Sequence, residues 1–146
     1  MKIHQLSMFL ENKPGHLGEL CRILANADIN ILTLSLADTQ QFGILRLIVR
    51  DWQQAKAVLE KAGVVVNVTE VVATEVEDRP GGFVRILDII EAAGINIEYM
   101  YAFTFRSGDK ATLVFRFDNP DAAIETLTTG GVNVIGDVEL YRLARQ

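Results

Sequence analysis

The sequence predicts an α+β protein built from two ferredoxin-like βαββαβ units in tandem, each an antiparallel sheet with its helices on one face. Two observations support this fold class. Residues 11–31 and 77–97 align without gaps and share eight identities in 21 positions, where average composition gives about one or two by chance. Each copy is also followed by the same order of apolar patterns. A duplicated unit explains both, with domains expected at residues 1–71 and 72–146.

The strands are predicted from short apolar or alternating segments. In the first half they are residues 3–10, 31–37, 44–49 and 66–72. In the second half they are residues 97–105, 111–117 and 138–143. Residues 67–77 have to end one unit and begin the next, which predicts a near-continuous strand and two rigidly abutted units.

Two helices are predicted in each half. Apolar residues recur at helical spacing over 17–27 and 83–93, directly after each Pro-Gly pair. The second helix of each half starts from a capping signal, an Asp in the first copy and Asn-Pro in the second. The residues expected to cap or end the four helices are Asp28, Asp51, Gly63, Gly94, Asn119 and Pro120.

Composition excludes several classes of function. The apolar share of 49% and the charged share of 23% are those of a globular protein. No run of about 18 apolar residues is present, so no membrane span is expected. A net charge of −5 with 14 scattered Lys and Arg residues argues against nucleic acid as a partner. The lone Cys21 cannot form an internal disulfide, and a cytoplasmic location is expected.

Catalysis is poorly supported because the sequence has no constellation of nucleophile and general base. His4 lies in a predicted strand, where packing explains it, and His16 lies on the Pro-Gly turn, where it is a surface residue or lines a pocket. Cys21 falls on the apolar face of a helix and has no partner thiol for a metal. We therefore expect no catalytic residue, no metal and no cofactor. Aromatic residues at 99–117 suggest RNA binding, but the acidic charge and the lack of an RNP1-like string oppose it.

The duplicated turn is the strongest candidate for a binding site. Pro14 fixes its own φ angle, and Gly15 lets the main chain approach a ligand closely. The helix that follows opens with N–H groups that lack internal partners, and these suit a small anion such as a carboxylate. Asn12 and Asn30 flank this point, and each carries a donor and an acceptor that suit a zwitterion. The structural alternative is that the turn only joins a strand to a helix and that Asn30 only caps a strand.

The string "LENKPGHLGELCRILANADINILTLSLA" resembles an ACT domain, the regulatory module that senses amino acids. It is similar to the opening of acetolactate synthase regulatory subunits, in which a strand ending in Glu-Asn-x-Pro-Gly-x-Leu precedes a helix and Ile-Asn-Ile. The second copy matches through "EDRPGGFVRILDIIEAAGINIEYMYA". Together the copies cover practically the whole chain, which therefore resembles a stand-alone tandem ACT protein.

In that family, ligands bind between paired ACT units, at the first turn and the start of the second strand. The resemblance implies ligand-binding roles in the first copy for Asn12, Gly15, His16, Leu17, Asn30 and Ile31. The matching residues of the second copy are Asp78, Gly81, Gly82, Phe83, Asn96 and Ile97. The copies differ at Asp78, whose carboxylate would repel a ligand carboxylate but attract its ammonium group. Phe83 would narrow the second pocket relative to Leu17.

These observations favour a non-catalytic sensor that binds a free amino acid, aliphatic or branched-chain, and that regulates amino acid metabolism. A homodimer is expected, because the family's sites are shared between units and ferredoxin-like sheets leave edges to protect. The alternative is a regulatory subunit of a biosynthetic enzyme such as acetolactate synthase. A third possibility is a structural dimer module that binds no ligand.

Overall fold

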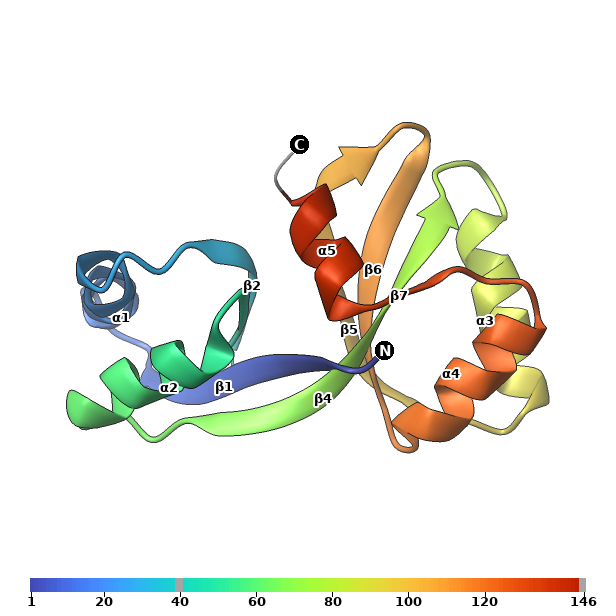
Figure 1. Ribbon diagram of the computed structural model, residues 1–146. Helices are drawn as coiled ribbons and strands as arrows, with labels where there is room; N and C mark the ends of the chain where they lie inside the picture. Colours follow the sequence, from blue (N-terminus) through green and yellow to red (C-terminus); the bar gives the residue numbers. More distant parts are fainter. Residues whose placement is uncertain (39–40, 145–146) are drawn as a thin grey trace. The chain divides into compact units, whose positions relative to one another are not determined.

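The computed structural model describes residues 1–38 and 41–144, and it divides into two compact units (Figure 1). The first unit comprises residues 4–69. The second comprises residues 70–146 together with residues 1–3, so the N-terminal residues belong to the second unit. Lys2 lies 3.1 Å from a carboxylate oxygen of Glu70 and 3.1 Å from one of Asp121. Hydrogen bonds to these two carboxylates raise the pKa of Lys2.

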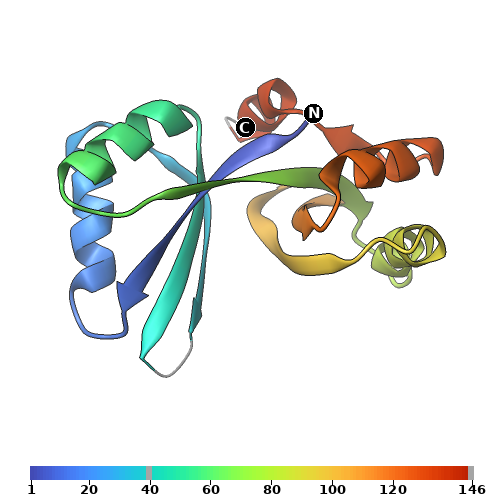
Figure 2. The same cartoon turned by 90° about the horizontal axis from the view of Figure 1, so that it is seen from below.

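The first unit has the predicted order of strands and helices. Its elements are β1 (Ile3–Glu11), α1 (His16–Asn26), β2 (Ile31–Asp38), β3 (Phe42–Val49), α2 (Trp52–Lys61) and the beginning of β4 (Asn67–Glu77). The strand order is β2-β3-β1-β4, and β3 pairs antiparallel with both β1 and β2. Figure 2 shows α1 and α2 together on one face of this sheet. This is the ferredoxin-like arrangement that the sequence predicts.

The second unit repeats this arrangement and adds a helix. Its elements are the rest of β4, α3 (Gly82–Ala92), β5 (Ile97–Ser107), β6 (Lys110–Phe117), α4 (Pro120–Thr129), β7 (Val134–Ile135) and α5 (Asp137–Leu143). The strand order is β5-β6-β4-β7, so β4 ends one unit and begins the next as a single strand. Figure 1 shows α3 and α4 on one side of this sheet and α5 on the other.

The strand predicted at residues 138–143 is wrong, because this segment forms α5. The buried residues Leu140 and Leu143 are three positions apart, which is a helical spacing, whereas Val138 is 79% exposed. Arg142 donates two hydrogen bonds to the Glu139 carboxylate across one helical turn. The last strand of the second unit lies upstream, where β7 pairs with two residues of β4.

The predicted helix ends are confirmed. The side chain of Asp51 accepts a hydrogen bond from the Gln54 N–H at 3.0 Å, and that of Asn119 accepts one from the Ala122 N–H at 3.2 Å. Pro120 occupies the first helical position of α4. Left-handed backbone follows α1 at Asp28 (φ 58°), α2 at Gly63 (φ 88°) and α3 at Gly94 (φ 67°).

Each unit has its own apolar core between its helices and its sheet. The first core is built from α1, α2 and the alternating residues of β1 and β3, with Leu6, Leu47 and Leu59 fully buried. The second is built around Phe115 and Phe117, whose stacked rings have centroids 5.2 Å apart. His4 stacks on Trp52 with centroids 4.6 Å apart, which agrees with a packing role. Cys21 is a half-buried free thiol.

Candidate functional site: two equivalent turns and their pockets

The two Pro-Gly turns have the same backbone conformation. Gly15 precedes α1 with φ 94°, and Gly81 precedes α3 with φ 85°. These left-handed conformations suit glycine, which has no Cβ to clash. The Lys13 N–H donates to the Glu11 carbonyl at 2.8 Å, and the Arg79 N–H donates to the Glu77 carbonyl at 2.9 Å. The duplicated sequence therefore encodes a duplicated turn.

A second pair of hydrogen bonds fixes each turn against the sheet. The Asn12 N–H donates to the Gln41 carbonyl at 3.0 Å, and the Asp78 N–H donates to the Asp109 carbonyl at 2.9 Å. Both acceptors lie in the connection between the second and third strands of their unit. Because main-chain atoms make these bonds, the turn keeps its shape whether its side chain is an amide or a carboxylate.

Neither α1 nor α3 has a side-chain hydrogen bond at its N-cap. The first intrahelical bonds run from the Glu19 N–H to the Gly15 carbonyl and from the Arg85 N–H to the Gly81 carbonyl. The N–H groups of the first turn, together with the helix dipole, make each helix start favourable for a negative charge. The second turn is tighter, because the Gly82 N–H also donates to the Arg79 carbonyl at 3.0 Å.

The predicted residues of the first unit do not meet in one cavity. Asn12 and Leu17 line a cavity of about 150 Å³, together with apolar side chains such as Leu36. Asn30 lines a different cavity of about 250 Å³, beyond the end of α1. His16 lines a third, described below, and Ile31 packs against the core.

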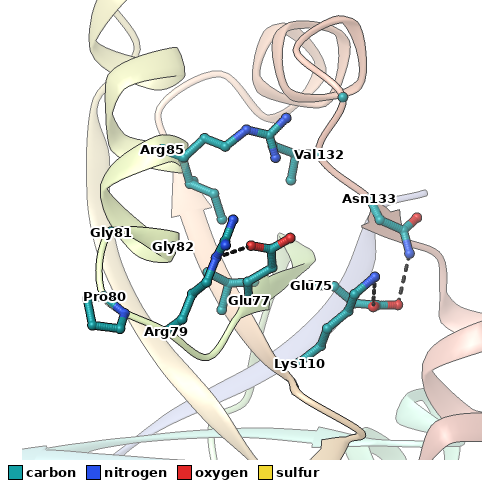
Figure 3. Close-up of a pocket in the computed structure, with 13 residues that line it drawn as sticks. Glu75, Glu77, Arg79, Pro80, Gly81, Gly82, Arg85, Lys110, Val132 and Asn133 are labelled. Atoms are coloured by element: carbon teal, nitrogen blue, oxygen red, sulfur yellow. Dashed lines mark hydrogen bonds and ion pairs between the residues drawn. The ribbon is translucent and has the colours of Figure 1, made fainter.

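The predicted residues of the second unit divide in the same way. Gly81 and Gly82 line a cavity of about 270 Å³ (Figure 3). Phe83 packs against the core and stacks on Phe115 with centroids 6.4 Å apart, and Ile97 also packs there. Asn96 is held by Asp118, because the Asn96 N–H donates to the Asp118 carboxylate at 3.1 Å and the Asp118 N–H donates to the Asn96 carbonyl.

One pocket occurs at the same place in both units. In each, it lies between the end of the first strand, the start of the first helix and the turn after the second helix. We call the cavity of about 270 Å³ the second-unit pocket and its counterpart of about 550 Å³ the first-unit pocket. The second-unit pocket is lined by Glu75, Val76, Glu77, Arg79, Pro80, Gly81, Gly82, Arg85, Ile86, Lys110, Gly131, Val132 and Asn133. The first-unit pocket is lined by Phe9, Leu10, His16, Glu19, Leu20, Ile23, Ala62, Gly63, Val64 and Val65.

The two pockets have the same frame and different chemistry. Leu10, Leu20 and Val64 in the first unit stand where Val76, Ile86 and Val132 stand in the second. The remaining positions exchange apolar residues for polar ones, or one charge for the other. The pairs are Phe9 and Glu75, His16 and Gly82, Glu19 and Arg85, and Val65 and Asn133. The sequence prediction did not single out Glu19, Arg85 or Asn133 as pocket residues. Glu19 and Arg85 are aligned within residues 11–31 and 77–97, where their opposite charges were the available signal, whereas Asn133 lies outside that alignment.

The polar side chains of the second-unit pocket form two groups and one isolated cation (Figure 3). In the first group, Arg79 pairs with Glu77. In the second, the Glu75 carboxylate accepts a hydrogen bond from the Asn133 amide at 2.9 Å and lies 3.6 Å from the Lys110 ammonium. Arg85 donates to the Gly130 carbonyl at 2.8 Å. The pocket therefore presents both signs of charge, which suits a polar or zwitterionic ligand.

The described residues contain neither a candidate metal centre nor a candidate membrane-spanning helix. In the part of the chain that the structure describes, no group of three or more His, Cys, Asp or Glu residues could hold a metal ion. No helix within residues 1–38 and 41–144 is long and apolar enough to cross a membrane.

Comparisons with known proteins agree with the fold. Residues 1–144 match the family model described as an ACT domain pair. The crystal structure of protein BT0572 from Bacteroides thetaiotaomicron superposes with a TM-score of 0.91 at 39% identity, over 98% of each chain. The ligand-free regulatory subunit of aspartate kinase from Thermus thermophilus superposes with a TM-score of 0.62 at 15% identity, over 87% of this chain and 91% of that one. The corresponding subunit from Thermus flavus gives 0.59 at 13% identity, over 90% and 94%. No curated protein matches the sequence.

Proposed function

The chain belongs to the ACT domain pair family of regulatory modules, and from this premise we propose that it is a non-catalytic sensor of a free amino acid. In this proposal the ligand carboxylate binds at the Pro-Gly turn, and the asparagines Asn12 and Asn30 bind its polar groups. Binding shifts a conformational or oligomeric equilibrium that regulates an enzyme of amino acid metabolism.

The observation that carries this proposal is the repeated helix start behind a left-handed glycine. Gly15 and Gly81 have nearly the same conformation, and as N-cap residues neither has a side chain of its own to bond the first turn of its helix. The N–H groups of a first helical turn lack intrahelical partners and suit a ligand or water. A carboxylate is the part of an amino acid that every candidate ligand shares, so the turn suits the class rather than one member.

The separation of Asn12 and Asn30 supports a site that two copies of the chain share. These residues flank α1, an 11-residue helix that is roughly 16 Å long, and they line different cavities. In this proposal one small ligand contacts Asn12 of one chain and Asn30 of another. A homodimer with twofold symmetry supplies this arrangement twice.

The apolar lining beside Asn12 favours an aliphatic ligand. Leu10, Leu17 and Leu36 form the apolar part of this lining, and the volume of about 150 Å³ suits a short side chain. Burial of a Val- or Leu-sized side chain contributes about 1.5–3 kcal/mol to binding. We therefore place the side chain of a branched-chain amino acid in this cavity.

The test is a titration of the full chain with each of the twenty amino acids, followed by calorimetry of those that raise the melting temperature. We expect Asn12→Ala and Asn30→Ala each to weaken binding by about 1–3 kcal/mol, because ligand groups lose their partners. Asn26→Ala is the matched control, since Asn26 is an exposed residue of α1 that lines none of these cavities. Unchanged affinity in both site variants would contradict the proposal.

A second candidate, a regulatory subunit that binds an enzyme with or without a ligand, is favoured by the apolar surface of the first unit. Phe9 is 67% exposed and Val65 is 78% exposed, and both line the first-unit pocket. Exposed apolar residues of this size are common at protein interfaces. Calorimetry with a purified biosynthetic enzyme, in the absence of any amino acid, distinguishes the two candidates: heat in this experiment supports the subunit, and heat with an amino acid alone supports the sensor.

A further inference from the structure

The second-unit pocket holds a cation whose charge no side chain balances. The lining contains three basic side chains, Arg79, Arg85 and Lys110, and two carboxylates, Glu75 and Glu77. Arg79 pairs with Glu77, and Lys110 pairs with Glu75. In the described part of the chain, no carboxylate lies within ion-pair distance of Arg85. The lining therefore has one net positive charge, located at Arg85.

Arg85 is held in place by the main chain. Its Nη2 atom donates to the Gly130 carbonyl at 2.8 Å, and the same atom lies so close to Gly131 that a Cβ there would be 3.2 Å away. Figure 3 shows the side chain leaving α3 and extending toward Val132, apart from the group formed by Glu75, Lys110 and Asn133. A guanidinium has five N–H donors in a fixed plane, so one bond to Gly130 orients the side chain and leaves other donors for a ligand.

The fold by itself does not require an arginine at this position. The equivalent residue of the first-unit pocket is Glu19, which has the opposite charge at the same place on the first helix. Phe9 and Val65 of that pocket replace Glu75 and Asn133. The two units share the frame and differ in the residues that would contact a ligand, which is the pattern expected when only one pocket recognises an anion.

We propose that the second-unit pocket binds a small metabolite of net charge −1 through a carboxylate–Arg85 contact, and that an acidic amino acid is its ligand class. One carboxylate of the ligand accepts hydrogen bonds from the Arg85 guanidinium, a charge-assisted contact that is often bidentate. Its ammonium group lies toward the Glu75 carboxylate, whose side chain is only 15% exposed. The pocket volume of about 270 Å³ is at the lower end of ligand cavities, which suits a molecule of this size.

This inference deepens the proposed function at Gly81 and Gly82, which belong to the predicted site and to this pocket, and it rests on that function for the ligand being an amino acid. It differs in the residues that it uses. The Asn12 cavity lies in the first unit and has three leucines and one ion pair in its lining, whereas this pocket lies within the second and has five charged side chains. The two sites therefore have separate ligands and separate tests.

The experiment is calorimetry of the full chain with L-aspartate, L-glutamate and, as the neutral isostere, L-glutamine. We expect saturable binding of at least one acidic amino acid, and at least about tenfold weaker binding of glutamine, because it lacks the second carboxylate. Arg85→Gln should weaken binding of the acidic ligand by about tenfold or more. Arg85→Lys should retain part of the affinity, since lysine keeps the positive charge and lacks the planar guanidinium. Arg22→Gln is the matched control, because Arg22 is an exposed arginine of α1 that lines neither pocket.

Three outcomes would overturn the proposal: no heat from either acidic amino acid at millimolar concentration, equal affinity for glutamate and glutamine, or equal losses in the Arg85→Gln and Arg22→Gln variants. Thermal melts of each variant show whether it is folded. If Arg85→Gln does not fold, the affinity of Arg85→Lys decides the test. If neither acidic amino acid binds, while an aliphatic amino acid binds the parent chain and binds Asn12→Ala poorly, the proposed function stands and this inference fails. If an acidic amino acid binds through Arg85 and no aliphatic amino acid binds, this inference stands and the proposed aliphatic ligand is excluded.

Discussion

At the scale of single residues, Gly82 marks the most demanding contact of the second turn. A Cβ at this position would lie 2.1 Å from the Glu77 carbonyl oxygen, which belongs to the main chain and cannot turn away. We predict that Gly82→Ala destabilises the second unit by roughly 1–3 kcal/mol, as overpacking does. Gly18→Ala is the matched control in α1, because its Cβ would meet only the flexible end of Arg22 at 3.2 Å.

Gly18→Ala should raise the free energy of unfolding instead of lowering it, since alanine is favoured over glycine in a helix by roughly 0.5–1 kcal/mol. Denaturant melts of the two variants measure both effects. A Gly82→Ala protein as stable as the parent would mean that the turn relaxes, and that the close approach of α3 to β4 is not needed.

Thr74 is a second residue whose side chain lowers the stability of the folded state. It lies on β4, is fully buried, and its hydroxyl has no hydrogen-bond partner in the described part of the chain. A buried hydroxyl without a partner destabilises the folded state. We predict that Thr74→Val, which keeps the shape and removes the hydroxyl, raises the free energy of unfolding by about 1 kcal/mol. Thr74→Ala should be less stable than Thr74→Val because it also loses a methyl group, and a destabilised Val variant would reveal a hydrogen bond at this position.

At the scale of helices and strands, the sequence was sufficient wherever a local signal coincided with the packing. Asp51, Asn119 and Pro120 are capping residues whose chemistry acts within one helical turn, so their roles follow from their neighbours. The strand at 67–77 was predictable because two adjacent units require it. The pockets could not be predicted from the sequence in the same way, because Arg85 and Gly130 meet only after α3 and α4 have packed.

Helix α5 shows why the remaining element was mispredicted. Val138 and Leu140 alternate with charged residues as in a strand, whereas the burial of Leu140 with Leu143 follows a helical spacing. The salt bridge between Glu139 and Arg142, across one turn of the helix, is the local signal that favours a helix. A seven-residue segment offers too few periods for the pattern alone to decide.

The same ion pair makes α5 sensitive to pH. The hydrogen bond from Arg142 lowers the pKa of Glu139 below its ordinary value of 4.5. A carboxyl with a lowered pKa stabilises the folded state above its unfolded pKa and loses that contribution as the pH falls through its folded pKa. We predict that the side-chain NMR signal of Glu139 titrates with a midpoint below 4.5, and that the protection factors of the α5 amides, corrected for the intrinsic pH dependence of exchange, fall as the pH falls through that midpoint. Arg142→Gln should return the midpoint to the ordinary range, and an unchanged midpoint would show that the pair does not form in solution.

At the scale of the whole molecule, the duplication produces two pockets that have the same backbone arrangement and different side chains. The turns at Gly15 and Gly81 are conserved between the units in backbone geometry. The pockets beside them contain Glu19 in one unit and Arg85 in the other. Because main-chain hydrogen bonds hold both turns, the pocket residues beside them can differ while the turns keep one geometry. Under the two proposals made above, the tandem protein would respond to two metabolites, whereas a symmetric dimer of single units would respond to one.

The proposed sharing of Asn12 and Asn30 between chains leads to a prediction that a site within one chain would not meet. Asn12→Ala and Asn30→Ala chains should each bind the aliphatic amino acid poorly. Refolding an equal mixture should restore binding to about a quarter of the sites, because half of the dimers are mixed and one of their two sites then has both asparagines. Calorimetric stoichiometry of the mixture measures this fraction, and the separately refolded variants provide the baseline. If both asparagines of a site came from the same chain, no mixed dimer would contain an intact site, and the mixture would bind no better than its components.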